Sequence, residues 1–127
     1  MATYSEKRKK LLHGIFVTAL EDGIGYWCEI ETYRWSKDKG ETEDLDSFYA
    51  EVIPEGEDGE RRIDADVIQR GLEMLSDPKK YKVARTNKET HKICVVAHLA
   101  DEDEGDIDAD VADAIVQAGL FEEVIYG

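Results

Sequence analysis

Several residue types that mark large protein classes are scarce in this sequence. Among its 127 residues there are two cysteines, two prolines and three histidines. Cys28 and Cys94 lie far apart and are too few for a disulfide-rich secreted scaffold, so we expect both as reduced thiols. No run of 18 apolar residues occurs, and no membrane-spanning helix is expected. Segment 1–16 is charged and then apolar but lacks a cleavage site, so we expect a mature N-terminus rather than a signal peptide.

Basic residues are also scarce relative to acidic ones. Sixteen Lys and Arg residues stand against 30 Asp and Glu residues, which gives a net charge of −14 at pH 7. Residues 40–66 hold eleven acidic and two basic groups, and residues 99–127 hold ten acidic groups and no basic one. Surfaces of this sign repel nucleic acid, so no direct nucleic-acid binding is expected. They suit a partner protein with a basic surface, although solubility alone explains them equally well.

The length and composition predict one domain. A chain of this size buries roughly two-thirds of its unfolded surface on folding. Its hydrophobic content of 42% is ordinary for a globular protein. We predict a single compact α+β domain over residues 1–127, with acidic loops near 36–46, 55–62 and 100–106.

Three segments have the apolar spacing of helices, and each begins with a residue that is favoured at the N-cap position. Gly71 lies inside the second segment, where glycine costs about 1 kcal/mol relative to alanine. We therefore expect another part of the chain to pack closely against Gly71. The predicted helices are 5–20, 64–75 and 108–119, with Ser5, Asp64 and Asp108 as their N-caps.

The other apolar segments have the alternation or the branched and aromatic content of strands. Residues 91–99 form a nearly continuous apolar run, which predicts a central strand covered on both faces. The mixed faces of residues 24–35 predict a bulge or partial cover on both sides. We predict a mainly antiparallel sheet of four to five strands packed with three helices. The predicted strands are 24–35, 47–53, 81–86, 91–99 and 124–126.

One pentapeptide, Ile-Asp-Ala-Asp-Val, occurs twice. It occupies residues 63–67 and 107–111, and a related helical segment follows each copy. An ancient duplication explains the repeat. Independent use of one favourable way to start a helix explains it too, because Asp is stabilising at the cap and in the first turn.

Spacing argues against a calcium site in the acidic stretch 101–108. An EF-hand loop needs oxygen ligands at positions 1, 3, 5 and 12, and glycine at position 6. Placing Gly105 at position 6 leaves Ala100 at position 1 and Val111 at position 12. The register that starts at Asp101 fails as well. A solvated acidic loop that leads into a capped helix is the stronger interpretation.

Residue spacing also argues against a zinc site and against a catalytic nucleophile. On a strand, Cys94 and His98 lie about 13 Å apart, and the CxxC and HExxH patterns are absent. The sequence also lacks GxSxG, and the segment 23–25 lacks the later glycine and the lysine of nucleotide-binding loops. We therefore expect no catalytic, cofactor-binding or metal-binding residue.

Two sets of residues are candidates for binding. The first is an acidic surface that faces a basic partner protein, and the second is an aromatic and arginine pocket. Aromatic and Arg side chains are enriched at binding hot spots, although core packing is the more common role for such aromatics. The acidic set is Glu41, Glu43, Asp44, Asp46, Asp101, Glu102, Asp103, Glu104 and Asp106. The pocket set is Tyr26, Trp27, Arg34 and Trp35.

Three stretches resemble a family of small, acidic, uncharacterised proteins encoded by actinobacterial phages. These are DIDADVADAIVQAGLFEEVIYG at residues 106–127, TALEDGIGYWCEIETYRW at residues 18–35, and IDADVIQRGLEML at residues 63–75. The chain departs from the family pattern at Asp22 and Glu122, where glycine is usual. The resemblance implies a phage accessory protein that acts in the host cytoplasm, and it implies no activity.

The sequence and the resemblance together favour a non-enzymatic acidic binder or inhibitor of a host protein, with defence and nucleic-acid-handling factors as candidate targets. The alternative is a small-molecule or nucleotide-binding module, a sponge, that uses the aromatic and arginine pocket. A homodimer is compatible with the terminal apolar strand, which can pair across a two-fold axis.

Overall fold

The computed structural model describes residues 4–34, 47–103 and 105–127. Its described part is α+β, with five α-helices and a three-stranded antiparallel sheet in the order β1-β2-β3. The predicted sheet of four to five strands with three helices is therefore wrong. In chain order the elements are α1 (Glu6–Thr18), the π-helical turn η1 (Ala19–Gly23), β1 (Cys28–Arg34), β2 (Tyr49–Pro54), β3 (Arg61–Asp64), α3 (Ala65–Ser76), α4 (Lys80–Val83), α5 (Lys88–Ala100) and α6 (Ala109–Phe121).

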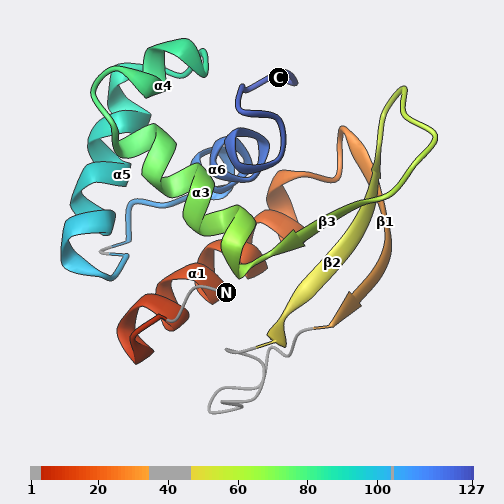
Figure 1. Cartoon of the computed structure of the whole chain (residues 1–127), viewed down its shortest axis with the longest axis horizontal. Coiled ribbons are helices and arrows are strands. Elements are labelled where there is room, and N and C mark those ends of the chain that lie inside the picture. The colour runs from red at the N-terminus through yellow and green to blue at the C-terminus, as the bar shows by residue number, and fades with distance from the viewer. Residues whose placement is uncertain (1–3, 35–46, 104) are drawn as a thin grey trace.

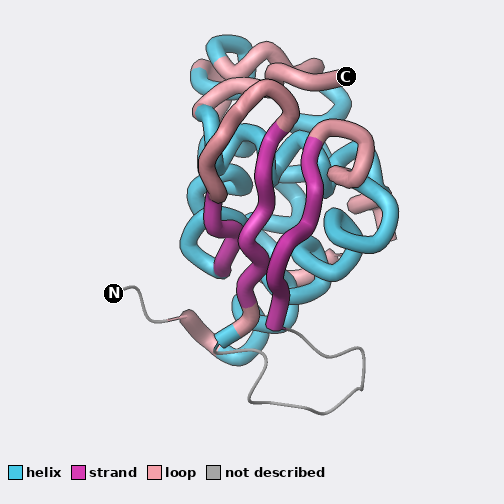
Figure 2. The backbone as a smooth tube through the Cα atoms, turned by 90° about the vertical axis from the view of Figure 1, so that its right-hand side faces the viewer, coloured by secondary structure: helices cyan, strands magenta, loops and turns pink. Residues whose placement is uncertain are grey.

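The helices lie on one side of the sheet and leave its other face uncovered. Figure 1 shows the sheet at the right and α5 at the far left, with α3 and α6 between them. Figure 2 shows the strands in front of the helices when the molecule is viewed from the sheet side. Fully buried core side chains include Phe16, Trp27, Leu72 and Ile115. The outer face of the sheet is thus open to solvent.

Alternation along β2 shows which side of the sheet faces the helices. Ala50 and Val52 are fully buried, whereas Tyr49, Glu51 and Ile53 are only half-buried. Successive side chains of a strand point to opposite faces. The first pair therefore faces the core, and the other three residues lie on the outer face.

Strand β1 contains the predicted bulge. Its pairing with β2 shifts register between Ile30 and Thr32, which leaves Glu31 as an extra residue. The insertion accounts for the mixed faces of this segment, since a bulge resets the alternation of side chains. Bulges and charged residues on an edge strand also discourage pairing with another chain.

All three predicted N-caps are confirmed. Each cap side chain accepts a hydrogen bond from the backbone N–H three residues later, which satisfies a donor that has no partner within the helix. The pairs are Ser5 Oγ with Arg8 N at 3.1 Å, Asp64 Oδ1 with Val67 N at 3.1 Å, and Asp108 Oδ1 with Val111 N at 2.9 Å.

The predicted close approach at Gly71 is confirmed as well. A Cβ atom on Gly71 would lie 1.9 Å from the carbonyl oxygen of Ile115 in α6. The contact is nearly reciprocal, because a Cβ on Gly119 would lie 2.1 Å from the carbonyl oxygen of Val67 in α3. The two helices that follow the repeated pentapeptide therefore cross at a pair of glycines.

Residues 81–86 and 91–99, predicted as strands, form no strand: residues 81–83 belong to α4, residues 84–86 to the turn that follows it, and residues 91–99 to α5. Asn87 starts α5, since its side chain accepts a hydrogen bond from Thr90 N at 2.8 Å. A short apolar run does not by itself distinguish a buried strand from a helix. Here the cap decides in favour of a helix, and that helix packs against α3.

Two further segments differ from the predicted strands. Residues 124–126 form no strand, because Gln117 Oε1 accepts hydrogen bonds from the N–H groups of Ile125 and Tyr126, each at 2.8 Å. Conversely, residues 61–64 were assigned to a loop and the start of a helix, and they form β3, which pairs with β2. A side chain eight or nine residues away decides the first case, and the neighbouring strand of a hairpin decides the second.

Candidate functional site

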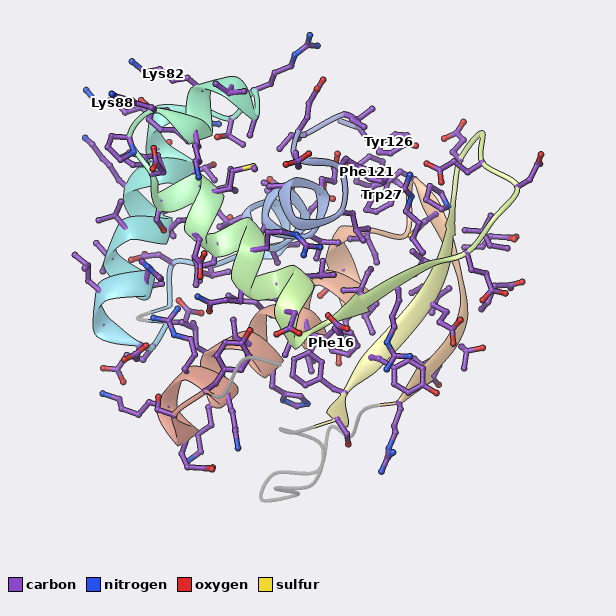
Figure 3. The ribbon with its side chains drawn as sticks, viewed as in Figure 1. Phe16, Trp27, Lys82, Lys88, Phe121 and Tyr126 are labelled. Carbon is purple, nitrogen blue, oxygen red and sulfur yellow. The ribbon has the colours of Figure 1, made fainter. Side chains whose placement is uncertain are left out.

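The outer face of the sheet carries a group of carboxylates that we call the acidic sheet patch: Glu29, Glu31, Glu51 and Glu60. Glu51 lies on the outer side of the central strand, opposite Thr32 of β1. Glu29, Glu31 and Glu60 are exposed. Oxygen-tipped side chains project from the face of the sheet that is turned away from the helices (Figure 3).

The acids of this patch are crowded. The pKa of Glu60 is raised, first by its hydrogen bond with Glu51, then by the negative charge of Glu51 and, more weakly, by that of Glu31. A carboxyl pKa rises in this way when like charges lie close together. The three acids therefore form one electrostatic unit that a cationic group would stabilise.

Two arginines lie near the patch: Arg34 pairs with Tyr49 at the end of β1, and Arg62 lies on β3 directly opposite Glu51. Arg62 stacks over the ring of Tyr49, with its guanidinium carbon 4.0 Å from the ring centroid, and lies 3.6 Å from Asp64. Tyr33 of β1 is 60% exposed, but it pairs with Ala50 and therefore lies on the core-facing side of the sheet. The sheet face thus combines an acidic part with an aromatic and basic end.

The acids after α5 have different surroundings. Asp101 Oδ1 accepts a hydrogen bond from Arg8 Nε at 2.6 Å, which ties the end of α5 to α1. Asp103 Oδ1 accepts from three backbone N–H groups of the following turn, those of residues 105, 106 and 107. Glu102 and Asp106 are exposed. The other predicted acids, Glu41, Glu43, Asp44, Asp46 and Glu104, lie outside the described residues.

The predicted aromatic and arginine residues do not line a single cavity in the described part of the chain. Trp27 is only 1% exposed. Its ring stacks on Tyr126, with the ring centroids 5.0 Å apart (Figure 3). Tyr26 is 56% exposed, Arg34 lies at the opposite end of β1, and Trp35 is outside the described residues.

A buried polar network that the sequence reasoning missed joins Tyr26 and Trp27 to α6. Asp113 accepts hydrogen bonds from the Tyr26 hydroxyl at 2.6 Å and from Trp27 Nε1 at 2.8 Å. Gln117, which is fully buried, donates to Asp113 at 2.9 Å and holds the backbone of residues 125 and 126. The sequence feature that indicates this network is the pair Asp113 and Gln117, two polar residues four positions apart on the otherwise apolar side of α6.

The pKa values of one hydroxyl and two thiols are raised, which makes these groups poor nucleophiles. Burial and the charge of Asp113 raise the pKa of the Tyr26 hydroxyl to about 12. Burial raises the pKa of the Cys28 and Cys94 thiols to about 12 as well. Thiols of this kind are protonated near neutral pH and react poorly, since the thiolate is the reactive form.

Clefts are present, but metal clusters are not found among the described residues. A cleft of about 480 Å³ lies beside Asp113 and Tyr26, and another of about 470 Å³ lies between α1 and the loop after α5. No group of three or more His, Cys, Asp or Glu residues in the described ranges is placed to hold a metal ion. Within those ranges no helix has the length and apolar content to cross a membrane.

Comparison of the chain with models of known protein families, with curated proteins and with solved structures finds no match.

Proposed function

We propose that this chain is a non-enzymatic binding module that presents the acidic sheet patch to a basic surface of a partner protein. The observation that carries the proposal is the crowding of Glu31, Glu51 and Glu60 on a sheet face that none of the described helices covers. Crowded like charges raise the free energy of the unbound protein. A Lys or Arg side chain from a partner would relieve that repulsion and form charge-assisted hydrogen bonds.

The shape of this face suits a protein more than a small molecule. A strand face is broad, and Tyr49, stacked under Arg62, adds aromatic area beside the acids, as is common at protein interfaces. Trp27, the centre of the predicted small-molecule pocket, is covered by Tyr126. No contact in the described chain favours the alternative, a small-molecule or nucleotide-binding module.

Together with the family resemblance, this proposal makes the chain a phage accessory protein that binds its partner in the cytoplasm of an actinobacterial host. The partner would be a host protein with a basic surface, and proteins that normally hold nucleic acid have such surfaces. Occupation of that surface by the acidic sheet patch would inhibit the partner by competition.

The test is a quantitative capture from host lysate with wild-type chain and with the triple variant Glu31→Gln, Glu51→Gln, Glu60→Gln. We expect at least a tenfold loss of the captured partner, and a steep loss with rising salt for the wild type, because the contact is electrostatic. The matched control, Asp22→Asn, Glu73→Gln, Glu122→Gln, removes the same charge from exposed acids elsewhere. Equal loss in both triple variants would show that only net charge matters and would refute the proposed site.

A further inference from the structure

An apolar stretch of the chain lies at the periphery of the fold. Helix α5 contains HKICVVAHLA, yet only Cys94 and Ala97 are buried in it. The helix packs against α3 and forms the outermost element on that side (Figure 1). Val96 and Leu99 of this helix are nonetheless exposed, so its outer side carries apolar side chains that the described part of the fold does not bury.

Helical geometry gathers a defined set of residues on that outer face. At 100° per residue, Lys88, Lys92, Val95, Val96 and Leu99 lie within about a third of the circumference. Leu99 is 78% exposed and Val96 is 47% exposed. We call these five residues the α5 outer face. It is basic in the first half of the helix and apolar in the second half.

The charges along this face are arranged for self-recognition. Lys88 and Lys92, at the start of the helix, have no ion-pair partner among the described residues. The acids Glu102 and Asp103 follow Asp101 after its end, and because the carboxylate of Asp103 already binds the next turn, Glu102 is the acid that can face a second copy. When two such helices pair antiparallel, the lysines of each lie beside the acids of the other. The valines and Leu99 then meet in the middle.

We propose that the α5 outer face is a homodimer interface, in which α5 packs antiparallel against α5 of a second copy about a two-fold axis near Val96. Closed two-fold pairing uses one surface twice, so a face that is complementary to itself is what such a dimer requires. This inference is independent of the acidic sheet patch, which lies on the opposite side of the molecule (Figure 1). A dimer would present two such patches.

The size of the face predicts a weak dimer. A helix of 13 residues is about 20 Å long, and pairing along it buries on the order of 1,000 Å² in total, less than a standard interface. Each copy also carries a net charge of −14. We therefore expect a dissociation constant on the order of 10–100 µM at about 150 mM salt, where the Debye length of about 8 Å screens the repulsion between copies.

Sedimentation equilibrium from 10 µM to 1 mM, with a reducing agent to prevent disulfides, tests the proposal. We expect a monomer–dimer equilibrium for the wild type. The double variant Val96→Gln, Leu99→Gln should be monomeric throughout, and its fold should persist because both side chains are exposed. The control Val83→Gln changes a valine on α4 that is 76% exposed, so its dimerisation should be unaffected.

A charge swap tests the antiparallel arrangement. Lys92→Glu should weaken dimerisation at least tenfold, and Lys92→Glu combined with Glu102→Lys should restore it, because the opposite charges again lie side by side. A wild-type chain that remains monomeric at 1 mM would overturn the proposal in favour of a different partner. So would a double glutamine variant that still dimerises. Failure of the charge swap to restore association would overturn the antiparallel pairing.

Discussion

At the scale of single residues, two glycines determine how closely the central helices approach. Gly71 and Gly119 each face a backbone carbonyl of the opposing helix at a distance that leaves no room for a methyl group. Carbonyl groups belong to the helix backbone, so they move only if the whole helix moves. Glycine destabilises a helix, but a larger residue at this crossing would force α3 and α6 apart and open the core between them.

Gly71→Ala should therefore lower the free energy of unfolding by about 2–4 kcal/mol, because its Cβ would overlap the carbonyl oxygen of Ile115. The matched change is Gly14→Ala in α1, where a Cβ would meet nothing within 4 Å. This second variant should be more stable by about 0.5–1 kcal/mol, as expected for an exposed helical glycine. Urea unfolding of both variants measures the difference. Equal effects at both positions would contradict the close crossing.

At the scale of elements, side chains distant in sequence hold segments that have little structure of their own. Residues 122–127, which follow α6, form no helix or strand, yet Gln117 binds their backbone and Tyr126 covers Trp27. In the same way Arg8 joins α1 to the end of α5. Its guanidinium donates to the carboxylate of Asp101 and to the backbone carbonyl of His98.

Gln117→Met keeps the size of the side chain and removes its hydrogen bonds. The N–H groups of Ile125 and Tyr126 lose their acceptor, so we expect a loss of about 2–4 kcal/mol in the free energy of unfolding. Hydrogen exchange at those two amides should become at least tenfold faster. Gln69→Met, on the more exposed surface of α3, is the control and should cost less than about 1 kcal/mol. Unchanged exchange in the tail would show that aromatic stacking alone holds it.

His98 should make stability depend on pH below neutrality. Burial, and then the charge of Arg8, lower its pKa from the ordinary 6.5, while Glu73 and Asp101 oppose the shift. The unfolded chain thus takes up a proton near pH 6.5 that the folded chain resists, so stability falls as the pH falls.

His98→Asn tests this effect, because the Asn side-chain oxygen can still accept from Arg8, as His98 Nδ1 does at 3.0 Å. Denaturant unfolding at pH 7.5 and 5.5 should show a smaller loss of stability in the variant, by less than about 1 kcal/mol per pH unit because the ring is partly exposed. An identical pH dependence in the two proteins would assign the effect to other groups.

At the scale of the whole molecule, charge repulsion outweighs charge pairing. The net charge is −14, and the ion pairs of the described residues are few and mostly at the surface, where each contributes less than about 1 kcal/mol. The acids lie mainly on the sheet and in the loops, while the lysines lie mainly on α1, α4 and α5. The fold thus separates the signs of charge.

Raising the NaCl concentration from about 10 to 200 mM should therefore increase the thermal midpoint by several degrees, because salt shortens the Debye length from about 30 Å to under 10 Å and weakens the repulsion. The triple variant Glu31→Gln, Glu51→Gln, Glu60→Gln should respond less. Choline chloride serves as a control for specific sodium binding. A midpoint that falls with salt would mean that the ion pairs dominate.

Local features of the sequence predicted the local structure well. Ser5, Asp64 and Asp108 were identified as N-caps, and the irregularity of β1 and the tight contact at Gly71 were expected. Each depends on a residue's own backbone preferences or on its near neighbours. The acidic composition was equally visible. Which acids lie together was not, because Glu31, Glu51 and Glu60 meet only through strand pairing.

The sequence by itself determined where the capped helices begin, how acidic the chain is, and that glycine was needed at position 71. Only the tertiary structure decided that Ile93, Val95 and Val96 belong to a peripheral helix rather than a central strand, since an apolar run satisfies either conformation and Asn87 with the surface of α3 selects one. It also decided that residues 124–126 form no strand, because the N–H groups of Ile125 and Tyr126 donate to the buried Gln117 instead. Backbone groups must find partners, and only the folded chain settles which partners are within reach.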